Sequence, residues 1–179
     1  MVGGVKAYYI GLLAFSLCLS AVGADKKPLP KDFKSLKVLA EKGDAYAQNN
    51  LGGMYENGEG VEKNHKEAVK WYRKAAEQNL AFAQHNLGLM YRFGGRGVKK
   101  DLKEAVKWYS KAAEQNDAPS QHNLGVMYAN GEGVEKDEKE AVKWYRKAAE
   151  QNVARAQHDL GYMYDNGEGV EEDDKEAVK

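Results

Sequence analysis

The chain has 179 residues, with 27 basic and 27 acidic side chains, so its formal net charge is zero. This length fits one compact domain or one short array of repeats. The balanced charge gives no electrostatic basis for binding a polyanion, and we therefore expect no nucleic-acid partner.

The first 24 residues have the pattern of a secretory signal peptide. Lys6 precedes an apolar run that extends from Ala7 to Leu19, and Val22 and Ala24 suit the small-residue cleavage rule. We expect cleavage before Asp25 and export to the periplasm or out of the cell. The alternative is an uncleaved membrane anchor, although the run is shorter than the about 20 residues of a membrane span.

The single cysteine, Cys18, lies inside this apolar run. Phe15, Ser16 and Leu17 precede it, whereas a lipid-attachment site requires small residues there, so we do not expect lipidation. After cleavage the protein would have no thiol. We therefore expect no disulfide, no thiolate nucleophile and no cysteine metal ligand, and stability must come from packing.

After the leader we expect a linker over residues 25–30 and a capping helix over residues 31–43. Four repeats follow, predicted at residues 44–79, 80–116, 117–152 and 153–179. The motifs LGGMY, LGLMY, LGVMY and LGYMY begin at leucines 36, 37 and 36 residues apart, namely Leu51, Leu87, Leu124 and Leu160. Tryptophan recurs in AVKWY shortly before KAAEQN, at Trp71, Trp108 and Trp144. Such periodicity indicates a solenoid.

Each repeat is predicted to hold two helices. The first helix of repeat 1 runs from about Ala45 to Glu56, with constant residues at helical spacing. The second helix has one continuous apolar face, formed by Ala68, Trp71, Tyr72, Ala75 and Ala76. A capping box predicts its start in every repeat, at Asn64…Glu67, Asp101…Glu104, Asp137…Glu140 and Asp173…Glu176. In such a box the cap side chain accepts a backbone amide while the glutamate reaches back to the amide of the cap residue.

The loop NGEGVEKD, residues 130–137, raises the question of a bound anion, because glycine-rich turns before helices can bind phosphate. No lysine stands where a phosphate-binding loop needs it. A calcium loop also fails, because Gly167 and Gly169 occupy ligand positions between Asp165 and Glu176. We therefore predict ordinary corners, in which the glycines supply positive φ and let the chain double back.

The repeats resemble the Sel-one-like repeat family, a branch of the tetratricopeptide-type helical arrays. The matching pattern LGxMYxxGxGVxxDxxxAxxWYxKAAEQ is almost complete in residues 124–151, and the resemblance covers about residues 31–179. It implies an all-α, right-handed superhelical solenoid of antiparallel helix pairs with about four repeats. It also implies a scaffold or adaptor for protein complexes, and bacterial members are often exported and engage partner proteins or host factors.

Both ends of the chain depart from the family pattern. In the capping helix Ser35 takes the tryptophan place and Leu36 the tyrosine place, which suits the more polar face of a terminal cap. At the other end the sequence stops at Lys179, before a Trp-Tyr pair. We therefore expect repeat 4 to be incomplete, with Leu160, Met163 and Tyr164 less covered than their counterparts.

Candidate binding residues come from comparing the repeats with one another. The columns that vary most in the first helices share one helix face, which the family resemblance places on the concave surface. Apolar residues on this face have no evident packing role in the sequence, as in a peptide groove; drift on a solvated face is the alternative. The candidate residues for binding a protein or peptide are Tyr46, Phe82, His85, Leu89, Arg92, His122, Val126, Arg155, His158 and Tyr162.

The three histidines of this face raise the question of a metal site. Successive helix axes stay about 8–10 Å apart, so stacked histidines would meet at most in pairs, and no third ligand type recurs nearby. We expect hydrogen-bonding surface histidines, with no metal and no cofactor. The tryptophans are expected in the core, rather than as a stacking platform for sugars or bases.

The predicted function is that of a non-enzymatic, exported scaffold that binds a protein segment. One alternative is a cell-wall-related hydrolase, because a cysteine-rich secreted branch of the family is associated with penicillin binding and β-lactamase activity. This chain lacks the cysteine pairs of that branch, and Ser35, Ser110 and Ser120 stand in no nucleophile motif. The other alternative is a structural oligomer that stacks end to end through repeat 4. Membrane contact is expected only through an uncleaved leader.

Overall fold

The computed structural model describes residues 28–95 and 97–170. The predicted leader, the start of the linker and residues 171–179 of repeat 4, with the cap predicted at Asp173, lie outside the described residues. The described part contains eight helices, which are α2 (Phe33–Glu41), α3 (Ala45–Asn57), α4 (His65–Glu77), α5 (Ala81–Phe93), α6 (Leu102–Glu114), α7 (Ala118–Asn130), α8 (Glu138–Glu150) and α9 (Ala154–Asn166).

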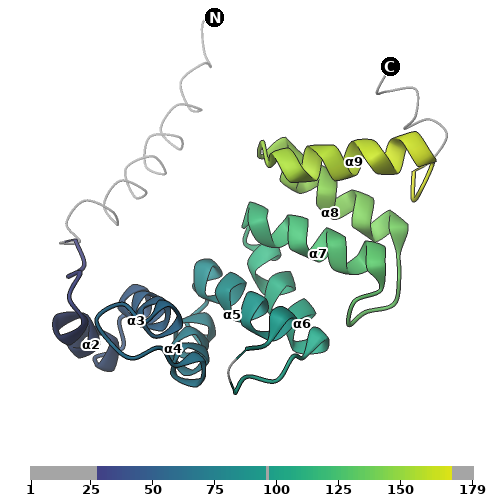
Figure 1. Cartoon of the computed structure of the whole chain (residues 1–179). Coiled ribbons are helices and arrows are strands. Elements are labelled where there is room, and N and C mark those ends of the chain that lie inside the picture. The colour runs from purple at the N-terminus through teal and green to yellow at the C-terminus, as the bar shows by residue number, and fades with distance from the viewer. Residues whose placement is uncertain (1–27, 96, 171–179) are drawn as a thin grey trace, which may run out of the picture.

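These helices stack in chain order along a curved array (Figure 1). Each helix packs mainly against the helices next to it in the chain. We call α3, α5, α7 and α9 the first helices of the repeats and α4, α6 and α8 the second helices. Helix α2 precedes them and packs against α3. The predicted all-α solenoid of about four repeats is confirmed.

The second helices begin at the predicted cap residues. In α6, for example, the Asp101 side chain accepts a hydrogen bond from the Glu104 amide at 3.1 Å. The other half of the predicted capping box is wrong, because the Asp101 amide donates to the carbonyl oxygen of Tyr91, at 2.8 Å, and Glu104 instead pairs with Lys107 at 2.9 Å. The same arrangement recurs at Asn64 and Asp137. The last turn of the preceding first helix therefore satisfies the amide that the glutamate was predicted to reach.

The glycines of the corners have local reasons. Gly131 ends α7 in the left-handed conformation with a φ of 69°, as predicted. Gly133 has a φ of 72°, and a Cβ atom there would overlap with the backbone of Leu102 at the start of α6. This loop thus packs against the preceding second helix, and its second glycine is needed for space as well as for conformation.

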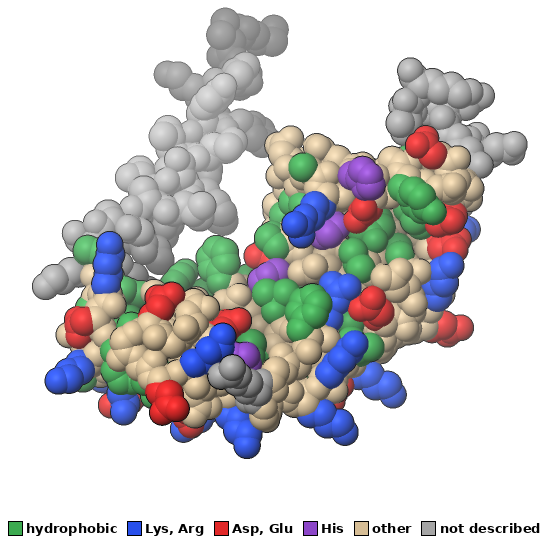
Figure 2. All heavy atoms as spheres, in the orientation of Figure 1, with side chains coloured by type: hydrophobic (Ala, Val, Ile, Leu, Met, Phe, Trp, Pro, Cys, Tyr) green, Lys and Arg blue, Asp and Glu red, His purple; other side chains and the backbone are tan. Residues whose placement is uncertain are grey.

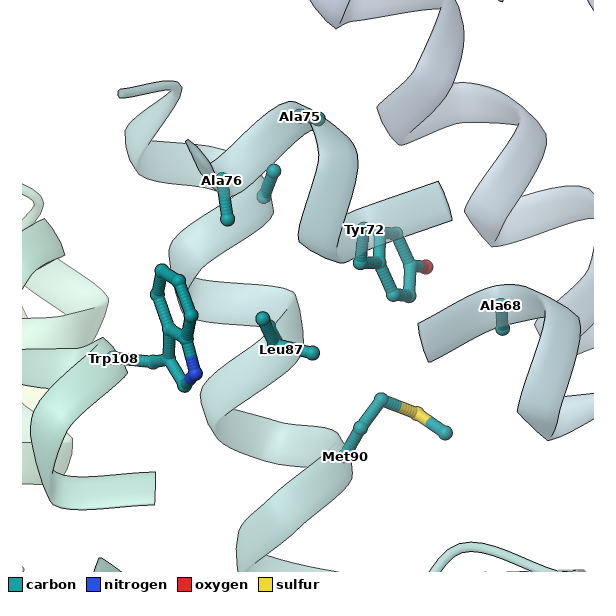
Figure 3. Close-up of a cluster of buried hydrophobic side chains, with 8 residues drawn as sticks. Ala68, Tyr72, Ala75, Ala76, Leu87, Met90 and Trp108 are labelled. Carbon is teal, nitrogen blue, oxygen red and sulfur yellow. The ribbon is translucent and has the colours of Figure 1, made fainter. Parts of the chain in front are cut away.

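The predicted tryptophan core is confirmed. Trp108 is only 3% exposed and lies in a cluster with residues of α4 and α5. Figure 3 shows its indole ring beside Leu87, with Met90 and Ala76 close by. One side chain of repeat 2 therefore also contacts repeat 1, which couples neighbouring repeats through apolar burial.

The glycine of each of the first three LGxMY motifs lies under a tyrosine ring of the second helix. A Cβ atom added to Gly88 would come within 2.6 Å of the Tyr109 ring. The corresponding distance is 2.6 Å for Gly52 against Tyr72, and 2.7 Å for Gly125 against Tyr145. These distances are well below van der Waals contact, so the close packing of the two helices requires glycine. At Gly161 of α9, no atom of the described residues lies within 4 Å of an added Cβ.

A buried glutamine in each complete repeat joins three helices. Gln84, which is 1% exposed, donates to the carbonyl oxygen of Ala76 at the end of α4, at 3.1 Å. It also accepts a hydrogen bond from Gln115 at the end of α6, at 2.6 Å. Equivalent bonds surround Gln48 and Gln121. Because buried amides are costly to leave unpaired, this network fixes how consecutive helices meet.

Candidate functional site

The candidate site is the face of the first helices that the second helices leave open. In α5 the third, fourth, seventh and eighth positions are buried, and helical geometry places the second, fifth, ninth and twelfth positions on the other side. All the candidate residues predicted from the sequence occupy these four positions. Figure 2 shows histidine and hydrophobic side chains at the surface of the bend. We call this surface the first-helix face.

Five of the candidates are open to solvent. The exposed fraction is 48% for Tyr46, 61% for Phe82 and 57% for Tyr162. Arg155 is also exposed, and 81% of the His158 side chain is accessible. Large aromatic side chains are seldom left so open, which makes the three rings the most informative part of the face.

His85 and His122 have a different role, because each links two consecutive first helices. The His85 Nδ1 atom lies 2.8 Å from the Ser120 Oγ atom of α7 and 3.5 Å from the carboxylate of Asp117. The His122 Nε2 atom lies 2.8 Å from the Asp159 carboxylate of α9. Burial lowers the pKa of His85, and the Asp117 charge opposes this shift less strongly. These histidines hold neighbouring repeats together, whereas His158 remains accessible.

The ninth and twelfth positions also contribute to contacts between repeats. Leu89 packs against the core cluster that contains Tyr109 and Trp144, and Val126 packs against the next cluster along the array. Arg92 pairs with Glu132 of the following corner at 3.1 Å. The expectation that Leu89 and Val126 have no packing role is wrong, because both side chains are partly buried against these clusters.

Ser120, His85 and Asp117 have the composition of a hydrolytic triad but not its geometry. In such a triad the serine and the carboxylate contact opposite nitrogens of the imidazole. Here both contact Nδ1. Ser120 is also completely buried, and Asp117 caps α7 by accepting the Ser120 amide. The three residues are therefore arranged to join two helices, and the serine cannot reach a substrate.

The sequence comparison missed a row of carboxamides at the sixth position of the first helices. Asn50, Asn86 and Asn123 form this row, and Asn86 donates to Asn49 of the preceding repeat at 3.0 Å. Asn49, Asn50 and Asn86 also line a pocket of ≈ 520 Å³ at the end of the face near α2. These asparagines hardly vary between repeats, and a search for variable columns therefore passed over them.

The described part of the chain holds neither a metal-ligand cluster nor a membrane-spanning helix. Within residues 28–95 and 97–170, no group of three or more His, Cys, Asp or Glu side chains is placed to hold a metal ion. None of the helices in these ranges is long and apolar enough to span a membrane. The accessible features of the first-helix face among these residues include aromatic rings, amides, Arg155 and His158.

Comparison with protein families gives a match along most of the chain. The family profile described as Sel1 repeat matches residues 45–80, 81–117, 118–153 and 154–179. Among curated proteins, a segment of 44 residues is 43% identical to a putative sel1-like repeat-containing protein, L18, of Acanthamoeba polyphaga mimivirus. That segment is 25% of this chain and only 8% of the viral protein.

Solved structures show the same architecture. A Sel1 repeat protein from Oxalobacter formigenes is 46% identical with a TM-score of 0.72, over 78% of this chain and 58% of that one. The protein c5321, a protective antigen of uropathogenic Escherichia coli strains with an SLR fold, is 46% identical with a TM-score of 0.75, over 77% of this chain and 29% of that one. Cysteine rich protein B of Helicobacter pylori is 31% identical with a TM-score of 0.58, over 77% of this chain and 98% of that one.

Proposed function

Because this chain belongs to the Sel1 repeat family, whose members generally serve as scaffolds for protein–protein interaction, we propose that it is an exported, non-enzymatic adaptor. Its partner is a protein segment that lies on the first-helix face. This face is the concave surface in our proposal, and the second helices with their lysines form the outside of the array.

The exposed aromatic rings carry this proposal. Tyr46, Phe82 and Tyr162 stand on three different first helices, each with about half or more of its surface in water. The Trp-Tyr pairs of the second helices are buried, so these rings are not needed for the repeat core. Aromatic side chains are enriched at the centres of protein interfaces, where their burial supplies much of the binding energy.

Export is supported by the leader pattern of residues 1–24 and by one similar structure. The sequence pattern has a basic residue, an apolar run and small residues before Asp25. The c5321 protein, which is 46% identical over the matched part, is described as a protective antigen. Cell fractionation of the full chain, beside a variant that lacks residues 1–24, tests this part of the proposal. Retention of the full chain in the cytoplasm would overturn it.

The binding proposal is tested by cross-linking the full chain to its partners in cells of its source. Phe82→Glu with Tyr162→Glu places two charges on the first-helix face at exposed positions, so the fold is preserved. The matched control is Val38→Glu, because Val38 is an equally exposed apolar residue, at 49%, but lies on α2. We expect the double variant to lose cross-linked partners that the parent and the control both retain.

Two results would count against this proposal. If the double variant retains every partner, the first-helix face is not the binding surface. If the Val38→Glu control loses the same partners as the double variant, the effect does not depend on this face. Circular dichroism of all three proteins checks that helix content is unchanged, so a loss of partners is read as a change of surface.

A further inference from the structure

We infer that the partner anchors one aliphatic side chain in the ≈ 520 Å³ pocket of repeat 1, and that Asn50 and Asn86 bond the peptide group beside it. The pocket lies at the end of the first-helix face near α2, so this anchor rests on the proposed function and specifies where the face holds the bound segment. One glycine, the apolar lining of the pocket and a chain of three carboxamides lead to it.

The glycine is Gly53, which lines the pocket as the ninth residue of α3, whereas the ninth residue of each other first helix has a large side chain. In α5 and α7 this residue is Leu89 or Val126, and each packs against the cluster that contains the tyrosine of the following second helix. At Gly53 the corresponding tyrosine is Tyr72, whose hydroxyl oxygen would lie 3.6 Å from an added Cβ atom. Outside the backbone of α3, no other atom of the described residues lies within 4 Å of it. Repeat 1 therefore lacks the aliphatic side chain that occupies this place in repeats 2 and 3.

The apolar lining of the pocket suits an aliphatic group. Leu29, Leu36 and Met54 line it, and all three are part of the cluster that contains Trp71 or pack against that cluster. Because the core of repeat 1 already holds these side chains, the apolar surface is formed before a ligand arrives. Burial of a leucine-sized group there removes apolar area from water. The volume falls within the about 300–1,000 Å³ of ligand pockets and also has room for the peptide groups next to that side chain.

The carboxamides form a chain of hydrogen bonds along the pocket. Asn86 donates to the Asn49 Oδ1 atom at 3.0 Å, and Asn49 donates to the Asn50 Oδ1 atom at 3.3 Å. Among the described residues, these bonds leave the carbonyl oxygen of Asn86 as an acceptor and the amide of Asn50 as a donor. A peptide group has the matching N–H donor and C=O acceptor. The two ends of the chain therefore suit the backbone of a segment whose side chain enters the pocket.

The pocket favours this occupant over a charged side chain or a helix. Lys31 and Glu59 both line it and carry opposite charges, so they give no preference for an acidic or a basic side chain. A bound helix satisfies its backbone groups internally and would leave Asn50 and Asn86 without partners. An aliphatic residue in a non-helical segment satisfies both the apolar lining and the carboxamides.

The test is chemical-shift mapping of the full chain, isotope-labelled at nitrogen, during titration with N-acetyl-leucine-N′-methylamide. This leucine probe carries an aliphatic side chain between its peptide groups. The comparison probe is N-acetyl-glycine-N′-methylamide, which has the same peptide groups and no side chain. We expect saturable shifts of the Asn50 and Asn86 side-chain amides with the leucine probe. The glycine probe should bind at least about tenfold more weakly, because it buries no aliphatic group.

Three variants locate the bound probe. Gly53→Leu places in repeat 1 the side chain that Leu89 supplies in repeat 2, and leucine is the better helix former, so the fold is preserved while the affinity for the leucine probe falls by about tenfold or more. Asn50→Asp keeps the oxygen that accepts from Asn49 but removes the amide donor, and should weaken the leucine probe by about threefold or more. Phe82→Ser is the matched control, because Phe82 is exposed on the first-helix face and does not line the pocket, and it should leave the affinity unchanged. Circular dichroism checks the helix content of all variants.

Several results would overturn the anchor. Equal binding of the two probes would show that the pocket does not select an aliphatic side chain, and no binding of either would show that it is not a peptide site. Binding that Gly53→Leu does not weaken, or that Phe82→Ser weakens equally, would place the leucine probe outside the pocket. Full affinity in Asn50→Asp would remove the carboxamides from the inference.

These failures are distinguishable from failure of the proposed function. Each result with the probes leaves the cross-linking test of the first-helix face as it stands. Retention of every partner by Phe82→Glu with Tyr162→Glu would overturn the proposed function, and neither of these residues lines the pocket.

Discussion

Gly88→Ala tests whether the contact between glycine and tyrosine limits how closely the two helices of a repeat approach. The added Cβ atom would lie 2.6 Å from two carbons of the Tyr109 ring, whereas ordinary contacts begin at about 3.4 Å. Tyr109 is completely buried, so the ring has no open space into which it can move. Overpacking of this kind costs about 1–3 kcal/mol.

A matched control is available within the chain. Gly161 is the eighth residue of α9, as Gly88 is the eighth residue of α5, and within residues 28–95 and 97–170 nothing lies within 4 Å of a Cβ atom there. Replacing glycine by alanine in a helix stabilises it by about 0.5–1 kcal/mol in both cases. Because this gain is common to both variants, the difference between them isolates the overlap. We expect Gly161→Ala to raise the free energy of unfolding relative to the parent. The change in this free energy caused by Gly88→Ala should be about 1–3 kcal/mol less favourable than the change caused by Gly161→Ala.

Urea unfolding followed by circular dichroism measures both variants, and amide hydrogen exchange reads α5 and α9 separately if the array unfolds in steps. A second check is the pair Gly88→Ala with Tyr109→Ala, in which the alanine at position 88 should no longer be destabilising. Equal effects of Gly88→Ala and Gly161→Ala would refute the argument, because they would show that the ring yields without cost.

Three further predictions concern the contacts between repeats. Trp108→Ala should lower the free energy of unfolding by about 3–5 kcal/mol, since the side chain is 3% exposed, and a urea midpoint that does not move would place it outside the core. Gln84→Leu should cost about 1–3 kcal/mol, because it removes the buried hydrogen bonds that Gln84 donates to Ala76 and accepts from Gln115. Gln157→Leu, at an exposed position, should cost less, and equal costs in the same urea melts would contradict the network. Burial lowers the pKa of His85 in the folded protein below the ordinary value of 6.5, so the unfolded chain binds more protons and stability should fall as the pH drops below about 6.5. Thermal melts between about pH 5 and pH 8 measure this dependence of stability on pH. His85→Gln should make stability depend less on pH, and an unchanged dependence would show that His85 is not its cause.

The parts of the fold that the sequence predicts are those governed by local rules. The first helix of repeat 1 was predicted from about Ala45 to Glu56 and ends at Asn57. Asp101 and Asp137 cap their helices, and Gly131 takes the predicted left-handed conformation. Each of these features depends on a few consecutive residues. Because the motif recurs, the same local pattern supports the same prediction in several repeats. Periodicity then identifies the buried stripe without knowledge of the partner helix.

The parts that the sequence did not predict depend on how one repeat meets the next. The bonds of Gln84 connect residues 8 and 31 positions away, and no spacing rule for a single helix contains them. The glutamates do not complete the capping boxes for a similar reason, because the amide of each cap residue donates instead to a carbonyl oxygen in the last turn of the preceding helix. The exposure of Phe82 was anticipated from its helix face, but that face alone could not separate it from Leu89, which is partly buried against the cluster that contains Tyr109 and Trp144.

Variation between repeats therefore has two causes in this chain. Arg92 varies from its counterparts because it pairs with Glu132 of the next corner, and Leu89 because it fills space against the next core cluster. Phe82 and Tyr162 vary without such a contact and remain open to water. A substitution at Leu89 would change both the packing of the array and its surface. A loss of binding in that variant could therefore not be assigned to one of these two effects. The residues that can report on a partner are the variable ones that the neighbouring repeat leaves uncovered.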